Sequence, residues 1–314
     1  MKHEVFHMEN AAEKYVVVVG GMNIDIGGTS FLPLLPGDSN PGRISVTPGG
    51  VGRNIAHNLA LFGTDVRLLS SCGNDEHGRI LLSSCQEIGI ETDRVLVLPN
   101  LPTSCYLYIA DPSGDMALAV NDMAVCERIT PLYLEQNREL LDQAAAVVMD
   151  ANLPGETICW LADNCKAPLY CDPVSVSKAP KVQKALGSIH MLKPNRLEAE
   201  LLSGVKINSP DDAALAAERL LARGVKNVCI SLASDGVYAA GEGEGFLLPN
   251  LPGKPFNTTG CGDAFMAALV YAGIHGCRLR QSVQAGLQAA AITAKSPLAV
   301  NSEISGRDIL CDHP

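Results

Sequence analysis

Positive charge and aromatic side chains are scarce in this sequence. Its 314 residues include 24 Lys and Arg against 34 Asp and Glu, a formal net charge of −10, and aromatic residues make up only 4%. Nucleic acids and anionic membrane surfaces bind to basic faces, so this charge balance argues against both kinds of partner. Small phosphorylated ligands remain compatible with it, because they need only a few local donors.

Long apolar runs and paired cysteines are also missing. No segment approaches the roughly 20 apolar residues that cross a membrane. The first fourteen residues, MKHEVFHMENAAEK, lack the apolar region of a signal peptide and are interpreted as a flexible tail. The eleven cysteines include no C-x-x-C pair, so we expect buried free thiols in a cytoplasmic protein, without disulfides or a zinc site.

Short β-branched runs alternate with amphipathic segments along the chain. Strands are expected at residues 15–21 (YVVVVGG) and near residues 66, 145, 168, 189 and 227, and helices at 52–63, 131–144 and 210–225. This alternation predicts an α/β fold with a doubly wound, mostly parallel sheet flanked by helices. The 47% hydrophobic content is enough for a large core.

Two stretches, at about 26–48 and 103–122, interrupt the alternation. The first contains RISVT, with period-two alternation, and the second contains a DPSG turn between two strand-like runs. Both favour a small antiparallel sheet outside the main layer. This sheet is either a lid over a ligand or a surface hairpin without a role.

Two glycines and an aspartate precede an apolar helical run in NTTGCGDAFMAAL, residues 257–269. The start of a helix has about four unpaired N–H groups and the positive end of the dipole, and glycines let a phosphate come close. Asp263 is therefore either a helix cap or a general base that takes a proton from an attacking hydroxyl.

Glycines also precede a helical segment in TPGGVGRNIAHNLALFG, residues 47–63. Their spacing is not G-x-G-x-x-G, which argues against a nucleotide-cofactor oxidoreductase, and no G-x-x-x-x-G-K-[ST] exists in the chain, which excludes a Walker-type loop. Asn54 in the first turn either binds a polar ligand or supports the loop. Asn23 and Asp25 follow the first strand, and form either a hydroxyl-binding site or a polar turn.

Polar residues also mark two later strand ends. In MLKPNRLEAE, residues 191–200, Asn195 and Glu198 either form a capping box or hold hydrated Mg²⁺, with Lys193 meeting a phosphate. In ISLASDGVYAAGEGEGF, residues 230–246, a strand, a turn of small residues and a second strand are candidates for a nucleotide pocket.

Taken in chain order, the five stretches at residues 19–28, 47–63, 191–200, 230–246 and 257–269 resemble the ribokinase/PfkB family of carbohydrate kinases. The resemblance extends from about residue 15 to the C-terminal region. The resemblance rests on G-G-x-x-x-N, N-x-x-E and a T-x-G-x-G-D-like glycine element. It implies a ribokinase-like domain at 15–314 with inserted lid strands, ATP and Mg²⁺ as cofactors, and a homodimer through the lid strands.

Three segments narrow the expected substrate. NPGRISVTPGGVGRNIAHNLALFG, VNDM and LKPNRLEAE are most similar to members that phosphorylate the 5'-hydroxyl of pseudouridine, giving pseudouridine 5'-phosphate and ADP. Kinases of another ribonucleoside or sugar (ribose, adenosine or a uridine-like compound) and a catalytically silent nucleoside-binding protein are the alternatives. Asp263 argues against the silent protein, since a pure binder needs no carboxylate there.

The resemblance also implies roles for individual residues. Asp263 matches the catalytic base, and the anion hole matches Gly260, Cys261 and Gly262. The expected substrate-binding residues are Asn23, Asp25, Gly49, Gly50, Asn54 and Asn152, and the position of the lid adds Thr47, Asn121 and Asp122. The expected phosphate- and ATP-binding residues are Lys193, Asn195, Ser231, Gly236, Leu287, Gln288 and Ala291, and those for the metal are Glu198 and Asn195.

The chain departs from the family pattern at several positions. Val51 and Arg53 stand where ribose kinases commonly carry Lys and Ala, and Asn152 stands where ribokinase has Glu, so we expect a substrate other than free ribose. Ala233 replaces a glycine that is usual in the nucleotide loop. Asn257 replaces an Asp that helps to bind a monovalent cation in many members, which leaves K⁺ as an open cofactor question.

Overall fold

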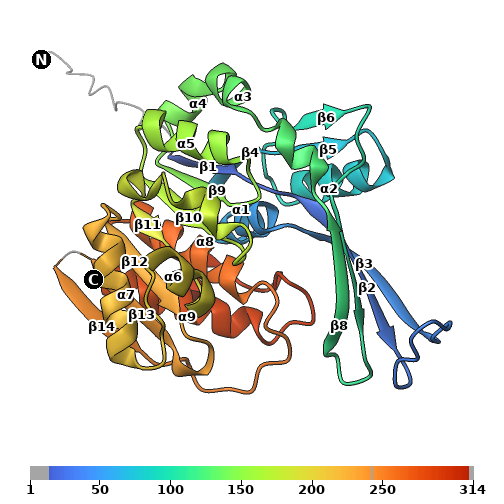
Figure 1. The fold of residues 1–314 in the computed structure, drawn as a ribbon. Coiled ribbons are helices and arrows are strands. Elements are labelled where there is room, and N and C mark those ends of the chain that lie inside the picture. Colours follow the sequence, from blue (N-terminus) through green and yellow to red (C-terminus); the bar gives the residue numbers. More distant parts are fainter. Residues whose placement is uncertain (1–13, 242, 311–314) are drawn as a thin grey trace, which may run out of the picture.

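The computed structural model of this protein describes residues 14–241 and 243–310, so all but the last residue of the expected tail at 1–14 lies outside the described residues (Figure 1). The main sheet has eight strands in the order β14-β13-β12-β11-β10-β9-β1-β4. Their bounds are β1 Tyr15–Val19, β4 Asp65–Leu69, β9 Ala146–Asp150, β10 Leu169–Asp172, β11 Met191–Leu192, β12 Asn227–Ser231, β13 Val237–Gly241 and β14 Glu244–Leu248.

Six neighbouring strands run parallel, namely β4, β1, β9, β10, β11 and β12, and β13 and β14 are antiparallel additions at one edge. Strands β1, β9 and β10 are buried at every position, as expected for parallel strands that are covered on both faces. The prediction of a mostly parallel, doubly wound sheet is confirmed. The strand expected near residue 189 is shorter than predicted, because only Met191–Leu192 pairs.

Helices cover both faces of the main sheet (Figure 1). On β1, Val16 and Val18 belong to the core formed with α1, α2, α8 and α9, whereas Val17 and Val19 belong to the core formed with α3 to α7. This follows from the alternation of side chains along a strand. The first group is α1 Val51–Leu61, α2 Glu76–Gln86, α8 Cys261–Ile274 and α9 Leu279–Thr293. The second is α3 Pro131–Gln136, α4 Arg138–Asp142, α5 Gly155–Asn164, α6 Arg196–Ser203 and α7 Pro210–Ala222.

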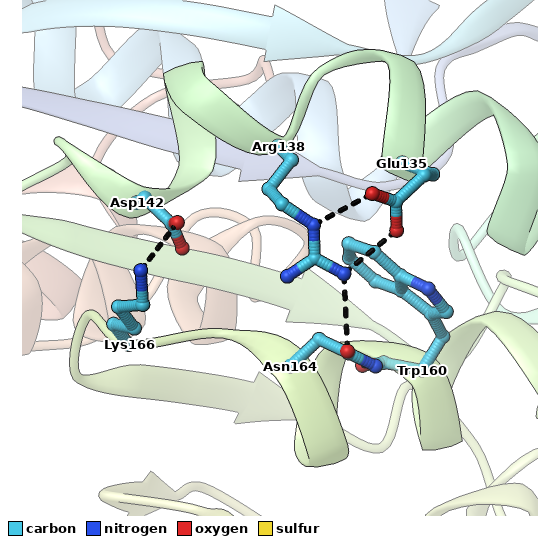
Figure 2. A network of polar contacts seen from close by, with 6 residues as sticks. All are labelled: Glu135, Arg138, Asp142, Trp160, Asn164 and Lys166. Carbon is cyan, nitrogen blue, oxygen red and sulfur yellow. Dashed lines mark hydrogen bonds and ion pairs between the residues drawn. The ribbon is translucent and has the colours of Figure 1, made fainter.

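The helix expected at 131–144 is broken at Asn137, whose side chain donates to the carbonyl O of Tyr133 (2.8 Å). Beyond the break, Arg138 lies over the ring of Trp160, with 4.9 Å to its centroid, and donates to Glu135 and Asn164 (Figure 2). A second pair, Lys166 with Asp142, joins the same segments. The break therefore points Arg138 towards α5.

The two stretches that interrupt the alternation form one four-stranded sheet, in the order β3-β2-β7-β8, which extends away from the main body (Figure 1). Its strands are β2 Asn23–Ser30, β3 Gly42–Gly49, β7 Cys105–Ala110 and β8 Met116–Asp122. The expected antiparallel pairing holds for β2 with β3 and for β7 with β8. It is wrong for β2 with β7, which are parallel because both strands leave the main body in the same direction.

The remaining elements are short. Strands β5 Ser71–Gly73 and β6 Leu96–Leu98 form a separate parallel pair, and the 3-10 turns are η1 Ala124–Arg128, η2 Ala179–Val182, η3 Leu186–Ser188, η4 Ala233–Asp235 and η5 Gly306–Asp308. No helix in the described residues is both long and apolar enough to span a bilayer.

Candidate active site

The start of α8 lies beside the start of α1. The N-cap of α8 is Gly260, with a left-handed φ of 80°, and a Cβ there would lie 1.8 Å from the carbonyl O of Ala299. Only glycine fits this turn. Asp263 makes no capping hydrogen bond; its Oδ2 accepts from Nδ2 of Asn54 at 2.9 Å. The structure therefore rules out the cap alternative for Asp263.

The surroundings of Asp263 suit a general base. Burial raises the pKa of Asp263 to about 7, and the like charge of Asp172 adds to this shift, whereas the Asn54 hydrogen bond and the charge of Lys193 oppose it. A base with a pKa near the working pH combines an ionised fraction with real affinity for a proton.

The N–H groups at the start of α8 are not equivalent. That of Cys261 donates to the carbonyl O of Thr258 at 3.3 Å. Those of Gly262 and Asp263 have no partner within the helix, because the first N–H groups of any helix lack one. The donors offered to an anion are therefore mainly Gly262 and Asp263.

Lys193 brings a positive charge to the same place. Its Nζ lies 3.0 Å from Oδ2 of Asp172, with both side chains buried, and 3.3 Å from where a Cβ on Gly262 would be. Burial lowers the pKa of Lys193, but the attraction of Asp172, with smaller contributions from Glu198 and Asp263, outweighs this, so the pKa is raised. Lys193 is thus a permanent cation facing the start of α8.

Asn195 and Glu198 form the capping box of α6. Oδ1 of Asn195 accepts from the N–H of Glu198 (2.9 Å), and the Glu198 carboxylate accepts from the N–H and Nδ2 of Asn195 (2.9 and 2.8 Å). The capping box is confirmed. Each carboxylate oxygen of Glu198 keeps a second lone pair, so the box does not exclude a metal role, which stays a prediction. Burial and then the charge of Asp172 raise the pKa of Glu198. In the ranges that the structure describes, no group of three His, Cys, Asp or Glu side chains is arranged to hold a metal.

On the small sheet, one row of paired residues crosses all four strands. It runs from Thr47 through Asp25 and Tyr106 to Asn121, so these side chains share a face. Asn23, two residues before Asp25, is on the same face and donates to Oδ1 of Asp25 at 2.6 Å. The structure therefore brings together four of the predicted substrate residues and adds Tyr106.

Of the other predicted substrate residues, Asp122 lies away from Asp25, whereas Gly49 lies beside it. Asp122 pairs with Cys105 on the opposite face of the small sheet, and its carboxylate accepts from the N–H of Ala124 at 3.1 Å. It is not brought near Asp25. Gly49 is beside Asp25, since a Cβ there would lie 2.2 Å from the carboxylate, and Gly50, with φ of 99°, lets the start of α1 approach Gly21 closely.

Asn152 lies at the ends of β1 and β9. Its N–H and that of Gly21 donate to the two oxygens of buried Asp150, at 2.8 and 2.9 Å, and its Oδ1 accepts from Nζ of Lys178. Burial raises the pKa of Asp150 to about 6. Asp150 thus holds together the two loops that follow these strands.

The predicted nucleotide residues come from two regions. Ser231 forms a bridge with Asn195, and its N–H donates to Pro194. Gly236, with φ of 93°, packs so closely that a Cβ would lie 2.1 Å from the carbonyl O of Leu248. Ala233 has a left-handed φ of 53°, which explains why glycine is usual there. The predicted adenine wall is on α9, with one side chain buried and two half-buried: Leu287, Gln288 and Ala291.

Comparison with known proteins identifies the family of this chain. Residues 13–305 match the model of the pfkB family of carbohydrate kinases. The chain belongs to this family.

Close relatives span most of its length. The pseudouridine kinase of Escherichia coli (strain K12) is 42% identical over 86% of this chain and 87% of its own. A carbohydrate kinase structure from Agrobacterium tumefaciens is 30% identical, with a TM-score of 0.82 over 94% of this chain and 95% of its own. The ribokinase structure from Thermotoga maritima is 26% identical, with a TM-score of 0.83 over 94% and 98%. The expected ribokinase-like fold and phosphotransferase class, with an alcohol acceptor, are confirmed.

Three charged or polar residues of this kinase's site escaped the sequence analysis: Asp150, Asp172 and Tyr106. Asp150 and Asp172 each end a buried strand, in AVVMD and LYCD. A carboxylate directly after a fully apolar strand is a signal that would have found both. Tyr106 carries no such signal, because only the register of β7 places it beside Asp25.

Proposed function

We propose that this kinase transfers the γ-phosphoryl group of ATP to the 5'-hydroxyl of pseudouridine, which gives pseudouridine 5'-phosphate and ADP. The observation that carries phosphoryl transfer is Asp263, a carboxylate that caps nothing, has a pKa of about 7 and stands at a helix start beside Lys193. The substrate is supported by the pseudouridine kinase of E. coli, at 42% identity.

The reaction needs positioning and charge stabilisation rather than a covalent intermediate. Asp263 takes the proton of the 5'-hydroxyl as that oxygen attacks phosphorus. The helix-start N–H groups of Gly262 and Asp263, which lack a partner within the helix, and the ammonium of Lys193 stabilise the charge on the transferred group. Asn54 holds the Asp263 carboxylate beside the substrate.

A divalent ion fits the charges around the phosphates. Four carboxylates, those of Asp150, Asp172, Glu198 and Asp263, influence one another here, and the cations that act on them are Lys193 and, at Asp150, Lys178. Such an excess of negative charge and oxygen ligands suits hydrated Mg²⁺. Glu198 and Asn195 would hold it, and when bound it would neutralise charge on the phosphates of ATP. The nucleotide itself would lie against Ser231, Gly236 and the α9 residues Leu287, Gln288 and Ala291.

The sugar is proposed to lie between α1 and the small sheet. Asn23, Asp25, Asn54 and Asn152, with the close backbone of Gly49 and Gly50, would hold its hydroxyls. Thr47 and Asn121 share the face of Asp25 and are the candidates for contacts to the base. The small sheet would then be the lid that excludes water.

The outer face of the same sheet supports a homodimer through the lid strands. Two rows of paired residues cross it, and they expose large apolar side chains at Ile44, Val46, Leu107, Leu118 and Val120. Contiguous apolar patches of this kind mark interaction sites.

The described cysteines are all free thiols, which supports the cytoplasm as the location.

An ADP-release assay over a panel of acceptors tests the function. We expect pseudouridine to be turned over far faster than uridine, adenosine, ribose or fructose 6-phosphate. Comparable turnover of ribose or fructose 6-phosphate overturns the substrate, and binding of pseudouridine without any ADP release favours a silent binding protein.

A further inference from the structure

Arg53 is a buried cation with weak partners. The side chain is only 4% exposed, and its contacts are long: Nη1 donates to Pro48 O at 3.4 Å and to Asn54 Oδ1 at 3.3 Å, and Nη2 to Ser84 Oγ at 3.5 Å. Its Nε is buried and makes no geometric hydrogen bond in the part of the chain that the structure describes. Burial lowers the pKa of Arg53, and the neighbouring Cys85 thiol and then the charge of Asp25 oppose this shift. Burying a guanidinium this way is costly, so its position needs a physical reason.

The contact with Asn54 determines which way that amide points. A guanidinium only donates, so the Asn54 atom that faces Arg53 must be the carbonyl oxygen. The amide nitrogen is then left to donate to Oδ2 of Asp263, at 2.9 Å. With the amide reversed, an oxygen would face the Asp263 carboxylate at that distance, and the two would repel.

Arg53 also connects this arrangement to the small sheet. Pro48 is the next-to-last residue of β3, and the charge of Arg53 lowers the pKa of Asp25 on the adjacent strand against the larger, raising effect of burial. The other basic group nearby is neutral, since burial and Arg53 lower the pKa of His57 to about 3. Arg53 therefore connects Asn54 to the end of β3 through Pro48 and acts electrostatically on Asp25 of β2.

We propose that Arg53 is a positioning residue for phosphoryl transfer, which orients Asn54 so that its amide donates to Asp263 and which joins that arrangement to the end of strand β3. The role rests on the proposed function in one respect, namely that Asp263 is the base.

The other charged or titratable groups that face Asp263 do not depend on Arg53. They are Asp150 at the end of β9, Asp172 at the end of β10, Lys193 after β11 and Cys261 on α8 itself. Because a substitution of Arg53 leaves them in place, the titration of Asp263 reports on the Asn54 contact. Loss of that donor disfavours the ionised carboxylate, so the pKa of Asp263 must rise.

The test compares kcat against pH for wild type, Arg53→Met, Arg53→Lys and the matched control Ser84→Ala, which loses only the Nη2 contact. For Arg53→Met we expect the acid limb to move up by about one pH unit, so that kcat is about tenfold lower below pH 7 and approaches wild type at pH 9. Arg53→Lys should move the limb less, and Ser84→Ala should not move it.

A double variant separates positioning from general damage. In an Asn54→Ala background, Arg53→Met should shift the acid limb no further. A loss of kcat by one factor at every pH, or a shift that persists without Asn54, overturns the proposal. If Arg53→Met does not fold, Arg53→Gln replaces it in both comparisons: an upward shift that depends on Asn54 supports the role, and a wild-type profile refutes it.

The assay uses whichever acceptor the wild type turns over best, so an error in the substrate leaves this test intact. Titration of the Asp263 carboxyl carbon by NMR gives the same comparison without turnover. A wild type that phosphorylates nothing would refute the function, whereas an unchanged Asp263 titration in Arg53→Met would refute the role of Arg53.

Discussion

The two large sheets of this kinase differ in what their strands do with apolar side chains. Strand β9 is buried at all five positions, whereas β8, in the small sheet, has no buried position among its seven. The polar groups of the main body stand just beyond fully packed strands, which hold them rigidly. The small sheet instead has one polar face and one exposed apolar face, so it is built to meet other surfaces. The proposed function therefore assigns the chemical step to the rigid main body and recognition to the small sheet.

The largest expected effect is on the chemical step in the main body. Asp263→Asn should lower kcat by about 10²- to 10⁴-fold, the usual contribution of a general base, with pseudouridine binding retained. Steady-state kinetics and calorimetric binding check this. Asp211→Asn, at an exposed position on α7, is the control, and a kcat close to wild type would show that Asp263 is not the base.

Breaking the buried ion pair between Lys193 and Asp172 is a second test of the main body. Lys193→Met should lower kcat by about 10²-fold, with little change in nucleoside affinity. It should also cost about 3–5 kcal/mol of unfolding free energy, because Asp172 is left buried without a partner. Lys193→Met with Asp172→Asn should recover stability but not turnover, as measured by denaturant unfolding. A loss confined to nucleoside affinity contradicts the phosphate role.

The raised pKa of Asp263 also predicts a pH dependence of stability. Its folded-state pKa of about 7 exceeds the ordinary value, so the folded state holds the proton more tightly and stability falls as pH rises towards 7. Asp263→Asn should therefore raise Tm more at pH 8 than at pH 5. Equal gains at the two pH values would mean that burial does not perturb this carboxyl.

A charge on the outer face of the small sheet should affect assembly without affecting the main body. Ile44, 75% exposed, ends one of the apolar rows on the edge strand β3, so Ile44→Asp should convert a dimer to a monomer in light scattering and raise KM for the nucleoside severalfold. Leu132→Asp, at a 68% exposed position on α3, is the matched control and should change neither. A monomeric wild type would contradict the dimer.

The smallest effect is expected at the ion pairs of α3, α4 and α5 (Figure 2). Arg138 and Glu135 are 36% and 50% exposed in their side chains, so water screens their attraction. Arg138→Ala should lower the free energy of unfolding far less than Lys193→Met does, and it should leave kcat unchanged. A cost as large as that of Lys193→Met would show that exposure is not what separates the two pairs.

Much of the site was predictable because local patterns carry it. The glycines before α1 and α8 mark the helix starts that are proposed to meet the ligands, and N-x-x-E predicts the capping box of α6. Asp150 and Asp172 were overlooked, although each stands at the end of an apolar strand, where the sequence alone could have indicated them. Tyr106 was not predictable, since its neighbours on the small sheet depend on how two distant hairpins pair.

By itself, the sequence determined the order of strands and helices, the burial of the central strands and the family, because hydrophobic periodicity and glycine spacing are local properties. Only the tertiary structure decided that Asp263 is not a cap, that β2 and β7 run parallel, and that Asp122 faces away from Asp25. Asn54 and Asp263 are 209 residues apart, and their hydrogen bond exists only because α1 and α8 pack together on one face of the main sheet. The same packing, by withdrawing water from Asp263, raises its pKa to about 7.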